Sequence, residues 1–399
     1  MSQQTKLLTI DFICICLLIF LAYCNITVFY NLYLYLQEID IPANWRGFLI
    51  GCSSLSTIAF FLFASPYLTV KNAIPCALAG ALIMIGCGIS YLYAHGVASL
   101  LLVRLANGAA VYLLSAGCMT LMVSRIAPEH SGQAFSLYSI ALLLPYSLVP
   151  SVCDVVTPHL PSVAYTYRDM SLLLVPGLAM IAVISRRQRR ARHGDASQPA
   201  MSLGEMYRNA LTPRIGLVLL LNGIYIITFA SLFFMAQGLF RSRGFHSVGS
   251  YFTIQMFCMI IIRLLGNRLF DKVHKVRLII FSFLVSSASF ALMAVSYSLV
   301  GLYASSLLMG IGMGVISPAL YGLMFTISSP RFKAVNSNLM MLSLQIGNFL
   351  GPVYGAWVMQ RVGYADLFLC NAGCCLVGIG LCFLLTSHRI DATRNIANA

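Results

Sequence analysis

Charge is the property that this sequence has least of. Only 9% of its 399 residues are Asp, Glu, Lys or Arg, and 11 Asp and Glu stand against 25 Lys and Arg. Soluble domains, by contrast, carry roughly 25% charged residues. Hydrophobic residues make up 59% of the chain, and its mean hydropathy is +0.86. These values exclude an ordinary soluble protein and make a lipid bilayer the expected surroundings of the chain.

Residue patterns that carry enzymatic or metal chemistry are missing as well. The 13 Cys lie almost wholly in apolar stretches and lack metal-finger spacing, so we interpret them as small apolar side chains. No nucleophile–base set is evident, and no phosphate-binding loop of the Walker type occurs. We therefore expect no enzyme activity, no cofactor, no metal site and no ATP-driven pumping.

Long apolar stretches are abundant instead. Twelve of them are long enough to cross a bilayer as helices. They predict an all-α membrane protein with twelve transmembrane helices. The predicted spans are 12–36, 47–68, 74–94, 98–123, 132–155, 168–185, 213–238, 247–269, 277–297, 299–326, 335–359 and 365–386.

Lys and Arg are distributed unevenly between the predicted loops. With a cytoplasmic N-terminus, eighteen of the 25 lie on the cytoplasmic side, five lie outside and two lie within spans. Cytoplasmic loops of membrane proteins are enriched in Lys and Arg, so we expect both termini in the cytoplasm. The net charge of +14 follows from this topology and requires no nucleic-acid partner.

A faint internal repeat relates the two halves of the chain. The residues whose type recurs 202 positions later include Gly47, Gly108, Ser115, Leu121, Met122, Pro128 and Pro150. Two parallel copies of a helical bundle are a common plan of secondary transporters. We predict one six-helix bundle over 1–185 and a second over 213–399. The cytoplasmic linker over 186–212 begins with a run of Arg, which we interpret as a stop-transfer anchor, with binding of anionic lipid head groups as the alternative.

Two arginines lie inside predicted spans, where charge is costly and usually functional. Arg104 shares a helix face with Asn107 and Gly108, which would allow close helix approach and an inward-facing guanidinium. The alternative is an arginine that merely holds helices together. Arg263 lies nearer the cytoplasmic end of its span, and for it a functional role and simple snorkelling to the interface are both open.

Acidic groups are nearly absent from the spans. Asp11 and Asp154 are among the few that fall at span ends, and no Asp or Glu lies in the middle of one. Proton-coupled carriers usually need a titratable group in the transport pathway. From its comparable depth in the bilayer, we hypothesise that Asp154 pairs with Arg104 as a coupling group.

Two predicted helices carry polar and aromatic stripes with a spacing of four residues. In the first span the stripe extends from Tyr23 to Tyr35. Such a face suits a cavity for an amphipathic solute, although hydroxyls and amides can also serve only to pack helices. Together with Arg104, the residues that we assign to the substrate cavity are Tyr23, Asn25, Thr27, Asn31, Asn107, Asn222, Tyr225 and Phe229.

Three short patterns have the form of transport motifs. The loop over 271–277 places an acid before several bases, the 104–108 segment reads Arg-x-x-Asn-Gly, and the 347–355 segment spaces glycines four apart around a proline. Glycines at that spacing make a flat helix face, and proline bends it. The residues that we assign to gating are Asp271, Lys272, Lys275, Gly351 and Pro352.

These patterns, with six plus six spans and a central linker, resemble the major facilitator superfamily over nearly the whole chain. In its twelve-span drug and metabolite efflux branch, the three patterns correspond to a gating motif, a proton-coupling motif of the fourth helix and an antiporter motif. The sequence departs from the family in three places. His274 replaces the usual glycine, the first-half gating segment keeps only Lys71, and the antiporter pattern occurs in span eleven rather than span five.

The resemblance implies alternating access around a cavity lined by spans one, four, seven and ten, in a monomer in the cytoplasmic membrane of a bacterium. We expect proton-coupled export of a drug-like or metabolite solute. The alternative within the same fold is an importer or facilitator of a small organic anion. A third possibility, an intramembrane enzyme or signalling receptor, lacks any supporting residue set.

Overall fold

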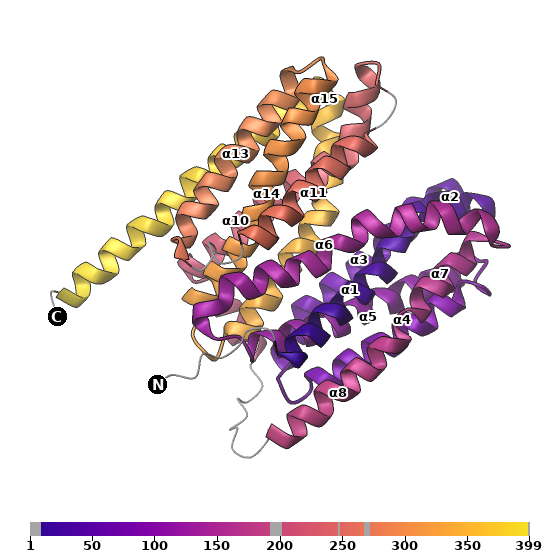
Figure 1. Ribbon diagram of the computed structural model, residues 1–399, viewed down its shortest axis with the longest axis horizontal. Helices are drawn as coiled ribbons and strands as arrows, with labels where there is room; N and C mark the ends of the chain where they lie inside the picture. Colours follow the sequence, from indigo (N-terminus) through magenta and orange to yellow (C-terminus); the bar gives the residue numbers. More distant parts are fainter. Residues whose placement is uncertain (1–8, 192–201, 246–247, 267–271, 398–399) are drawn as a thin grey trace. The chain divides into compact units, whose positions relative to one another are not determined.

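The computed structural model describes residues 9–191, 202–245, 248–266 and 272–397, and all regular elements in these ranges are helices (Figure 1). The α-helices of the first half are α1 (Ile10–Thr27), α2 (Leu32–Glu38), α3 (Ala43–Ala64), α4 (Ala73–Ser90), α5 (Val97–Val123), α6 (Ser131–Val156), α7 (Val163–Leu172) and α8 (Val175–Ala191). Those that follow are α9 (Leu203–Ala210), α10 (Pro213–Ser242), α11 (Gly249–Leu265), α13 (Lys275–Val295), α14 (Leu299–Ile327) and α15 (Lys333–Ala397). Short 3-10 helices are η1 (Val28–Asn31), η2 (Ser65–Tyr67), η3 (Pro128–His130) and η4 (Thr157–His159).

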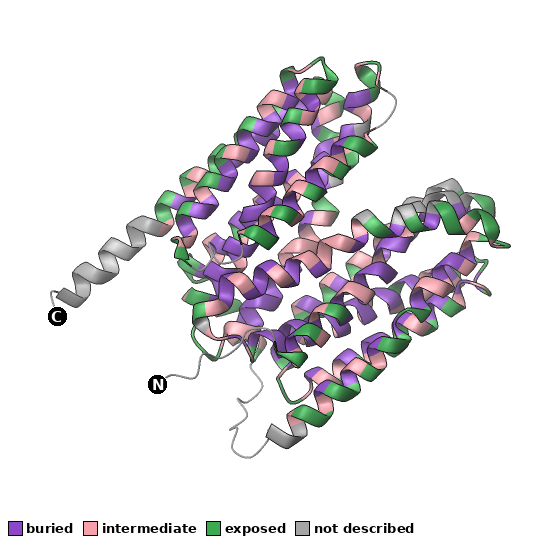
Figure 2. Ribbon diagram, viewed as in Figure 1, coloured by how far each residue is buried: buried purple, intermediate pink, exposed green. Residues whose placement is uncertain are grey.

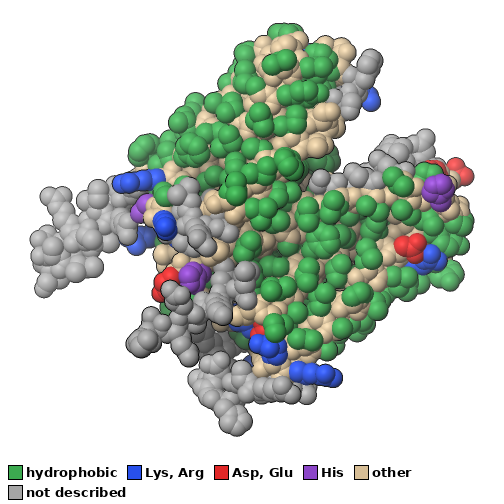
Figure 3. Space-filling view, viewed as in Figure 1, with side chains coloured by type: hydrophobic (Ala, Val, Ile, Leu, Met, Phe, Trp, Pro, Cys, Tyr) green, Lys and Arg blue, Asp and Glu red, His purple; other side chains and the backbone are tan. Residues whose placement is uncertain are grey.

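Apolar side chains cover the outside of these helices. In Figures 2 and 3, exposed positions on the described helices are mostly hydrophobic, and Leu102 and Phe257 are 69% and 66% exposed. Exposure of such side chains to water would be unfavourable, whereas lipid tails accept them. Within the described residues, nine helices are long and apolar enough to cross a membrane. This supports a multi-pass membrane protein.

The predicted count of twelve spans is not confirmed, and the difference has identifiable sources. By length and composition, the last apolar segment is a single stretch over Lys333–Leu385. Gly363 inside it nevertheless has a non-helical φ of 87° and ψ of 176°. Its 53 residues would extend about 80 Å, more than twice the hydrocarbon core. In addition, α11 has only 17 residues. Twelve spans therefore stay a prediction.

The described chain forms two compact units. Unit 1 comprises Met1–Ala127, Ile140–Tyr207 and Arg331–Leu342, and unit 2 comprises Pro128–Ser139, Arg208–Pro330 and Ser343–Ala399. The first turns of α6 thus belong to unit 2, and the first turns of α15 belong to unit 1.

The internal repeat is visible in the helix boundaries. Adding 202 to the first residue of α4, α5 and α6 gives the first residue of α13, α14 and α15. Within unit 1, α5 packs on α3 and α4, and within unit 2, α14 packs on α11 and α13. The two units therefore repeat the same helix neighbours as well as residue types.

Hydrogen bonds between helices keep the same offset even where the residue type changes. Ser56 donates to the carbonyl of Leu105 at 2.8 Å, and its repeat partner Cys258 donates to that of Leu307 at 3.6 Å. Further equivalent pairs of bonds are Cys87 to Val103 with Ser289 to Ser305, and Arg104 to Leu49 with Ser306 to Tyr251. The backbone register of the two units is thus conserved while the donors differ.

Glycines bring the paired helices into close approach. A Cβ added at Gly108 would clash with the Ser53 carbonyl of α3, and one at Gly310 would lie 2.8 Å from the Gln255 carbonyl of α11. Because position 255 is the repeat partner of position 53, the same backbone contact occurs in both units. The repeated Gly108/Gly310 pair therefore marks a helix contact that only glycine permits.

The polar stripe predicted for the first span does not lie on one continuous helix. The α1 helix ends at Thr27, the 3-10 helix η1 follows, and Tyr35 belongs to α2. A 3-10 segment has about three residues per turn, so a spacing of four no longer keeps residues on one face across it. The expectation of an unbroken stripe from Tyr23 to Tyr35 is therefore wrong.

Candidate functional site

Arg104 lies on α5 inside unit 1 and is only 5% exposed. Its Nε donates to the Leu49 carbonyl at 3.1 Å, and its Nη2 donates to the Ile50 carbonyl at 2.8 Å and to Ser53 Oγ at 2.9 Å. The close approach at Gly108 places these α3 acceptors within reach. The positive charge is therefore surrounded by neutral dipoles.

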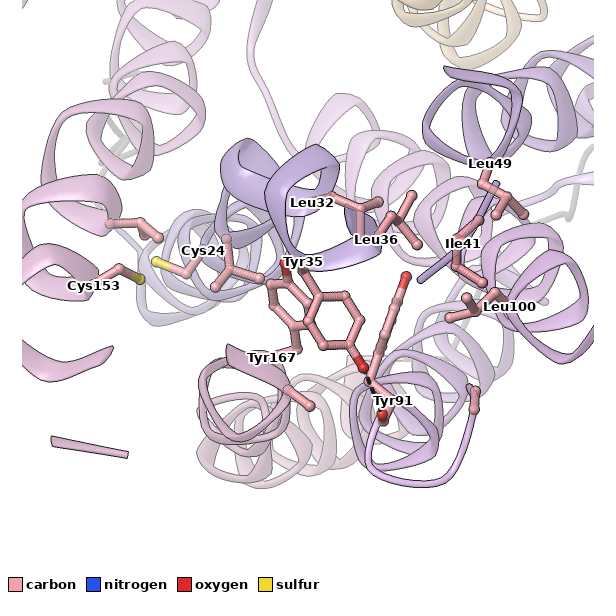
Figure 4. Close-up of a cluster of buried hydrophobic side chains, with 14 residues drawn as sticks. Cys24, Leu32, Tyr35, Leu36, Ile41, Leu49, Tyr91, Leu100, Cys153 and Tyr167 are labelled. Atoms are coloured by element: carbon pink, nitrogen blue, oxygen red, sulfur yellow. Dashed lines mark hydrogen bonds between the residues drawn. The ribbon is translucent and has the colours of Figure 1, made fainter. Parts of the chain in front are cut away.

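An aromatic cluster flanks the Arg104 guanidinium. Its central carbon lies 4.9 Å from the ring centroid of Phe29, within the range of a cation–π contact. Phe29 packs on Tyr91 at 5.2 Å and on Tyr167 at 4.9 Å. Tyr35 packs on both tyrosines and donates its hydroxyl to the Tyr91 carbonyl at 3.3 Å (Figure 4). The negative face of the Phe29 ring therefore stabilises the buried cation, and the tyrosines pack around that ring.

Two of the predicted cavity residues form a polar link between three helices of unit 1. The amide of Asn25 on α1 donates to Ser171 Oγ on α7 at 2.5 Å. Asn107 on α5 donates to Asn25 Oδ1 at 3.5 Å. Both asparagines are buried, with exposures of 0% and 2%. Their amides therefore hydrogen-bond within the bundle, which is the helix-packing role left open by the sequence.

The other predicted residues of the first span are placed as follows. Tyr23 is buried, and its ring centroid lies 6.4 Å from that of Tyr146 on α6. Thr27 is buried at the end of α1. Asn31 belongs to η1, but its side chain lies outside the described residues.

Arg263 on α11 is the second buried arginine and lies in unit 2. Its Nε donates to the Gly314 carbonyl at 3.1 Å, its Nη2 to the Met313 carbonyl at 3.1 Å and its Nη1 to the Ser139 carbonyl at 3.2 Å. The Tyr225 hydroxyl lies beside the guanidinium. Arg263 is 1% exposed, so the alternative of snorkelling to the interface is wrong.

The aromatic residues predicted on α10 form a ladder inside unit 2. The ring centroids of Tyr225 and Phe229 lie 6.4 Å apart in a stacked arrangement, and those of Phe229 and Phe233 lie at the same distance. Asn222, one turn before Tyr225, is buried and donates to Ser343 Oγ on α15. The sequence thus identified a real aromatic ladder, and Tyr225 joins it to Arg263.

The predicted gating residues are only partly described. Asp271 and the side chains of Asp154 and Pro352 lie outside the described residues. Lys272 is exposed and Lys275 is half-buried beside Gly322. Gly351 is buried against α10, where an added Cβ would lie 2.9 Å from the Ile227 carbonyl. Of these predictions, the structure shows a tight helix contact at Gly351.

Acidic side chains in the described ranges pair with arginines other than the two buried ones. Asp11 binds Arg187 at 2.8 Å and Arg125 at 3.6 Å, and burial is the main cause that lowers the pKa of Arg125. The remaining ion pairs are Arg168–Asp169 and Arg331–Glu205. Arg104 and Arg263 thus have no carboxylate partner within the described part of the chain.

Two residues of these clusters were not singled out from the sequence. Ser53 binds Arg104 through its hydroxyl, and Ser139 binds Arg263 through its backbone carbonyl. Carbonyl acceptors leave no residue-type signal, so only the arginines themselves could be identified. The proline at position 318, four residues after Gly314, was the available signal on α14.

Comparison with known proteins shows likeness to one family model and to solved structures. Residues 223–397 match the family model of the Major Facilitator Superfamily. Among curated protein sequences, none matches the chain significantly.

Two solved structures are similar over nearly their whole length. The human organic anion transporter MFSD10 (TETRAN) has a TM-score of 0.72 and 16% identity, covering 94% of this chain and 99% of that chain. A Major Facilitator Superfamily transporter, FucP, in the outward conformation has a TM-score of 0.69 and 16% identity, covering 95% and 99%. At such identities the likeness establishes the fold alone.

Proposed function

We propose that this chain, a Major Facilitator Superfamily transporter protein by its matched C-terminal half and its fold, moves a small organic anion across the membrane by alternating access. Fold does not fix the substrate, so the proposal rests on the chemistry of the two units. In each access state the solute would bind residues of the bundle interior, and transport would follow from its different affinity for the two states.

One observation carries the anionic substrate. Each unit buries an arginine, and within the described residues both are solvated only by carbonyls, hydroxyls and aromatic faces. Dipoles solvate a charge but leave its net value unchanged, and in a low-dielectric interior the resulting positive potential is strong. A solute that carries a carboxylate or similar group is attracted by this potential, whereas a cation is repelled. The similar human protein MFSD10 is an organic anion transporter, which is compatible with this proposal.

Proton-coupled export of a drug-like or metabolite solute is the second candidate. It is favoured by the Arg104-x-x-Asn107-Gly108 pattern, whose three residues are buried together on α5. The proposed Arg104–Asp154 pair would supply a titratable group. Against it, no acidic side chain among the described residues pairs with Arg104.

For topology we propose twelve spans with both termini in the cytoplasm of a bacterium, in agreement with the distribution of Lys and Arg. The cavity residues assigned from sequence remain proposed binding residues. Tyr225 and Phe229 are supported by their place in the aromatic ladder, which Tyr225 joins to Arg263. Asp271, Lys272 and Lys275 are proposed to stabilise one closed state through ion pairs. Gly351 and Pro352 are proposed to let α15 move against α10.

Transport by the purified protein in proteoliposomes tests the proposal. We would compare uptake of radiolabelled benzoate, benzamide and benzylamine, which have nearly equal size but negative, neutral and positive charge. We expect benzoate to be transported in preference to the other two. Replacement of Arg104 by Gln should lower benzoate uptake by about tenfold, equivalent to about 1.4 kcal/mol, and Arg104→Lys should retain more activity.

The same vesicles separate the two candidates. Uptake of benzoate that ignores an imposed proton gradient supports anion transport without proton coupling. Equal uptake of the three compounds, or preference for benzylamine, would contradict an anionic substrate. Release of substrate driven by a proton gradient and lost in Asp154→Asn would favour proton-coupled export instead.

A further inference from the structure

Helix α14 contains a proline in its interior. Pro318 lies within Leu299–Ile327, and the helix continues on both sides of it. A proline has no backbone N–H, and its ring crowds the carbonyl four residues earlier. That carbonyl belongs to Gly314, so it lacks the N–H that residue 318 would otherwise donate to it in α14. In a lipid environment an unpaired carbonyl is unfavourable and needs a donor from another group.

Arg263 supplies that donor. Its Nε binds the Gly314 carbonyl at 3.1 Å, and its Nη2 binds the adjacent Met313 carbonyl at 3.1 Å. The two helices are close here, because a Cβ added at Gly314 would lie 3.2 Å from the Ile262 side chain on α11 and would require that side chain to shift. The guanidinium is thus placed on the turn that the proline weakens.

The third arm of the guanidinium reaches a different helix. Its Nη1 binds the Ser139 carbonyl of α6 at 3.2 Å, and Ser136 Oγ donates back to the Arg263 carbonyl at 2.8 Å. These first turns of α6 belong to unit 2, as do α11 and α14. One side chain therefore connects the interrupted turn of α14 to α6.

The repeat provides an internal comparison. The partners of Arg263, Gly314 and Pro318 in unit 1 are Phe61, Tyr112 and Ala116. Without a proline, the carbonyl of Tyr112 keeps the N–H of Ala116 as its helical donor. In place of the arginine, Phe61 packs against the Tyr112 ring with centroids 4.8 Å apart. The proline and the arginine thus occur together in one unit and are both absent from the other.

From this geometry we propose that Arg263 is a positioning residue that replaces the hydrogen bond removed by Pro318, and that it fixes the interrupted turn of α14 against α6. Its guanidinium donates hydrogen bonds to three backbone carbonyls. Arg263 therefore stabilises the local structure of α14 and is not the primary contact of the substrate. The proposal does not depend on the identity or charge of the substrate.

A double-mutant cycle between Arg263→Gln and Pro318→Ala tests the coupling. The thermal midpoint of the detergent-solubilised protein is the first readout. In the parent protein, which keeps Pro318, Arg263→Gln should lower the midpoint by about 5 °C. In the Pro318→Ala variant the Gly314 carbonyl regains its helical N–H, so the same change should cost only about 2 °C. The matched control is Arg104→Gln. The carbonyls that Arg104 binds lie on α3, which has no interior proline. Arg104→Gln should therefore lower the midpoint equally with and without Pro318→Ala.

Hydrogen exchange of peptides covering residues 309–320 is the second readout. Arg263→Gln should accelerate exchange of these amides, and Pro318→Ala should restore protection in the double variant. If Arg263→Gln yields no folded protein while the double variant does, that rescue supports the proposal. If both fail to fold, Arg263→Lys replaces Arg263→Gln in the cycle, because it keeps a donor for one carbonyl. Equal midpoint losses in the two backgrounds, or exchange unaffected by the substitution at position 318, would overturn the proposal.

Discussion

Arg104 in unit 1 and Arg263 in unit 2 both reach backbone carbonyls of a neighbouring helix, but they stand at positions that the repeat does not pair. The repeat partner of Arg104 is Ser306, which bonds the equivalent carbonyl of Tyr251 with a short hydroxyl. The partner of Arg263 is Phe61, which packs on a ring. Each unit therefore carries its buried charge at a position of its own, on a backbone register that both share.

The acceptors of the two arginines also differ in kind. The carbonyls of Leu49 and Ile50 lie in the continuous helix α3, so each has a helical N–H partner besides Arg104. Gly314 lies four residues before a proline and depends on Arg263. This difference agrees with the proposals that Arg104 in unit 1 serves a solute and that Arg263 in unit 2 is required by the fold.

The largest expected effect comes from removing each guanidinium with the same substitution. Arg263→Met should destabilise the protein by about 3 kcal/mol, because buried carbonyls lose their donor. Arg104→Met should cost about 1 kcal/mol, since its carbonyl partners keep their helical bonds. Unfolding by SDS in mixed micelles measures both. A larger cost for Arg104→Met would reverse the assignment of the two roles.

Next in size is the shared glycine contact. Gly108→Ala and Gly310→Ala should each destabilise by about 1–3 kcal/mol, because the added methyl group meets backbone atoms of α3 or α11. The control is Gly51→Ala, where an added Cβ meets nothing within 4 Å. The same unfolding assay applies. Similar tolerance at positions 51, 108 and 310 would mean that the two units do not rely on this contact.

A smaller effect is expected from exchanging donors between the units. Cys258→Ser gives unit 2 the donor that unit 1 has at Ser56, and Ser56→Cys makes the converse change. Because the carbonyl acceptors at Leu307 and Leu105 remain, each variant should change stability by less than about 1 kcal/mol. Thermal midpoints close to that of the parent protein are the expected result. A loss as large as that of Gly310→Ala would show that the register is not equivalent in the two units.

The smallest effect concerns an exposed ion pair that has no repeat counterpart. Arg331, whose repeat partner is Glu129, binds Glu205 at 2.9 Å. The Ser202 backbone N–H, at 3.0 Å, is the main cause that holds the pKa of Glu205 below its usual value, with Arg331 adding to it. The folded state thus favours the carboxylate, and its contribution is present above about pH 4.3 and is lost as pH falls through the lowered pKa.

Thermal midpoints at about pH 7 and about pH 3.5, on either side of the usual carboxyl pKa, measure this contribution. Glu205→Gln should reduce the difference between the two midpoints slightly, whereas Asp40→Asn, which removes an exposed acid outside the described ion pairs, should leave it unchanged. A larger response from Asp40→Asn would show that general acid titration, and not this pair, sets the pH dependence.

Features that depend on the type of residue at each position could be predicted from the sequence. The apolar helices and the repeat at Gly108 and Gly310 follow from composition and spacing. The resemblance to the family rests on sequence motifs, and the family model matches residues 223–397 while the two solved structures share the fold. Matching identical residues at this offset nevertheless does not reveal a related helix contact. Gly80 packs on Ala110 in unit 1, whereas Gly312 packs on Ser282 in unit 2, so the glycine has moved to the other helix of the same pair. An offset between identical residues cannot detect such an exchange.

Features that depend on backbone acceptors could not be predicted. The burial of Arg263 was uncertain from its position near a span end, because the carbonyls that bind it have no sequence signature. The 3-10 turn after Thr27 could not be predicted either, because its sequence contains no glycine or proline. Asn25 has the polarity of a cavity residue, but only the position of Ser171 on α7 reveals where its amide donates.

The single left-handed residue inside α15 has a consequence for biogenesis. Because Gly363 alone separates its two apolar segments, they would leave the ribosome close together and enter the bilayer as a helical hairpin. With the cytoplasmic C-terminus proposed above, the tip of that hairpin must carry Arg361 to the far side of the membrane. Its guanidinium lies 3.9 Å from the ring centroid of Trp357 and donates to that residue's carbonyl at 3.2 Å. Trp357 of the same hairpin is thus a partner for Arg361, the cation that the tip of the hairpin has to carry across the membrane.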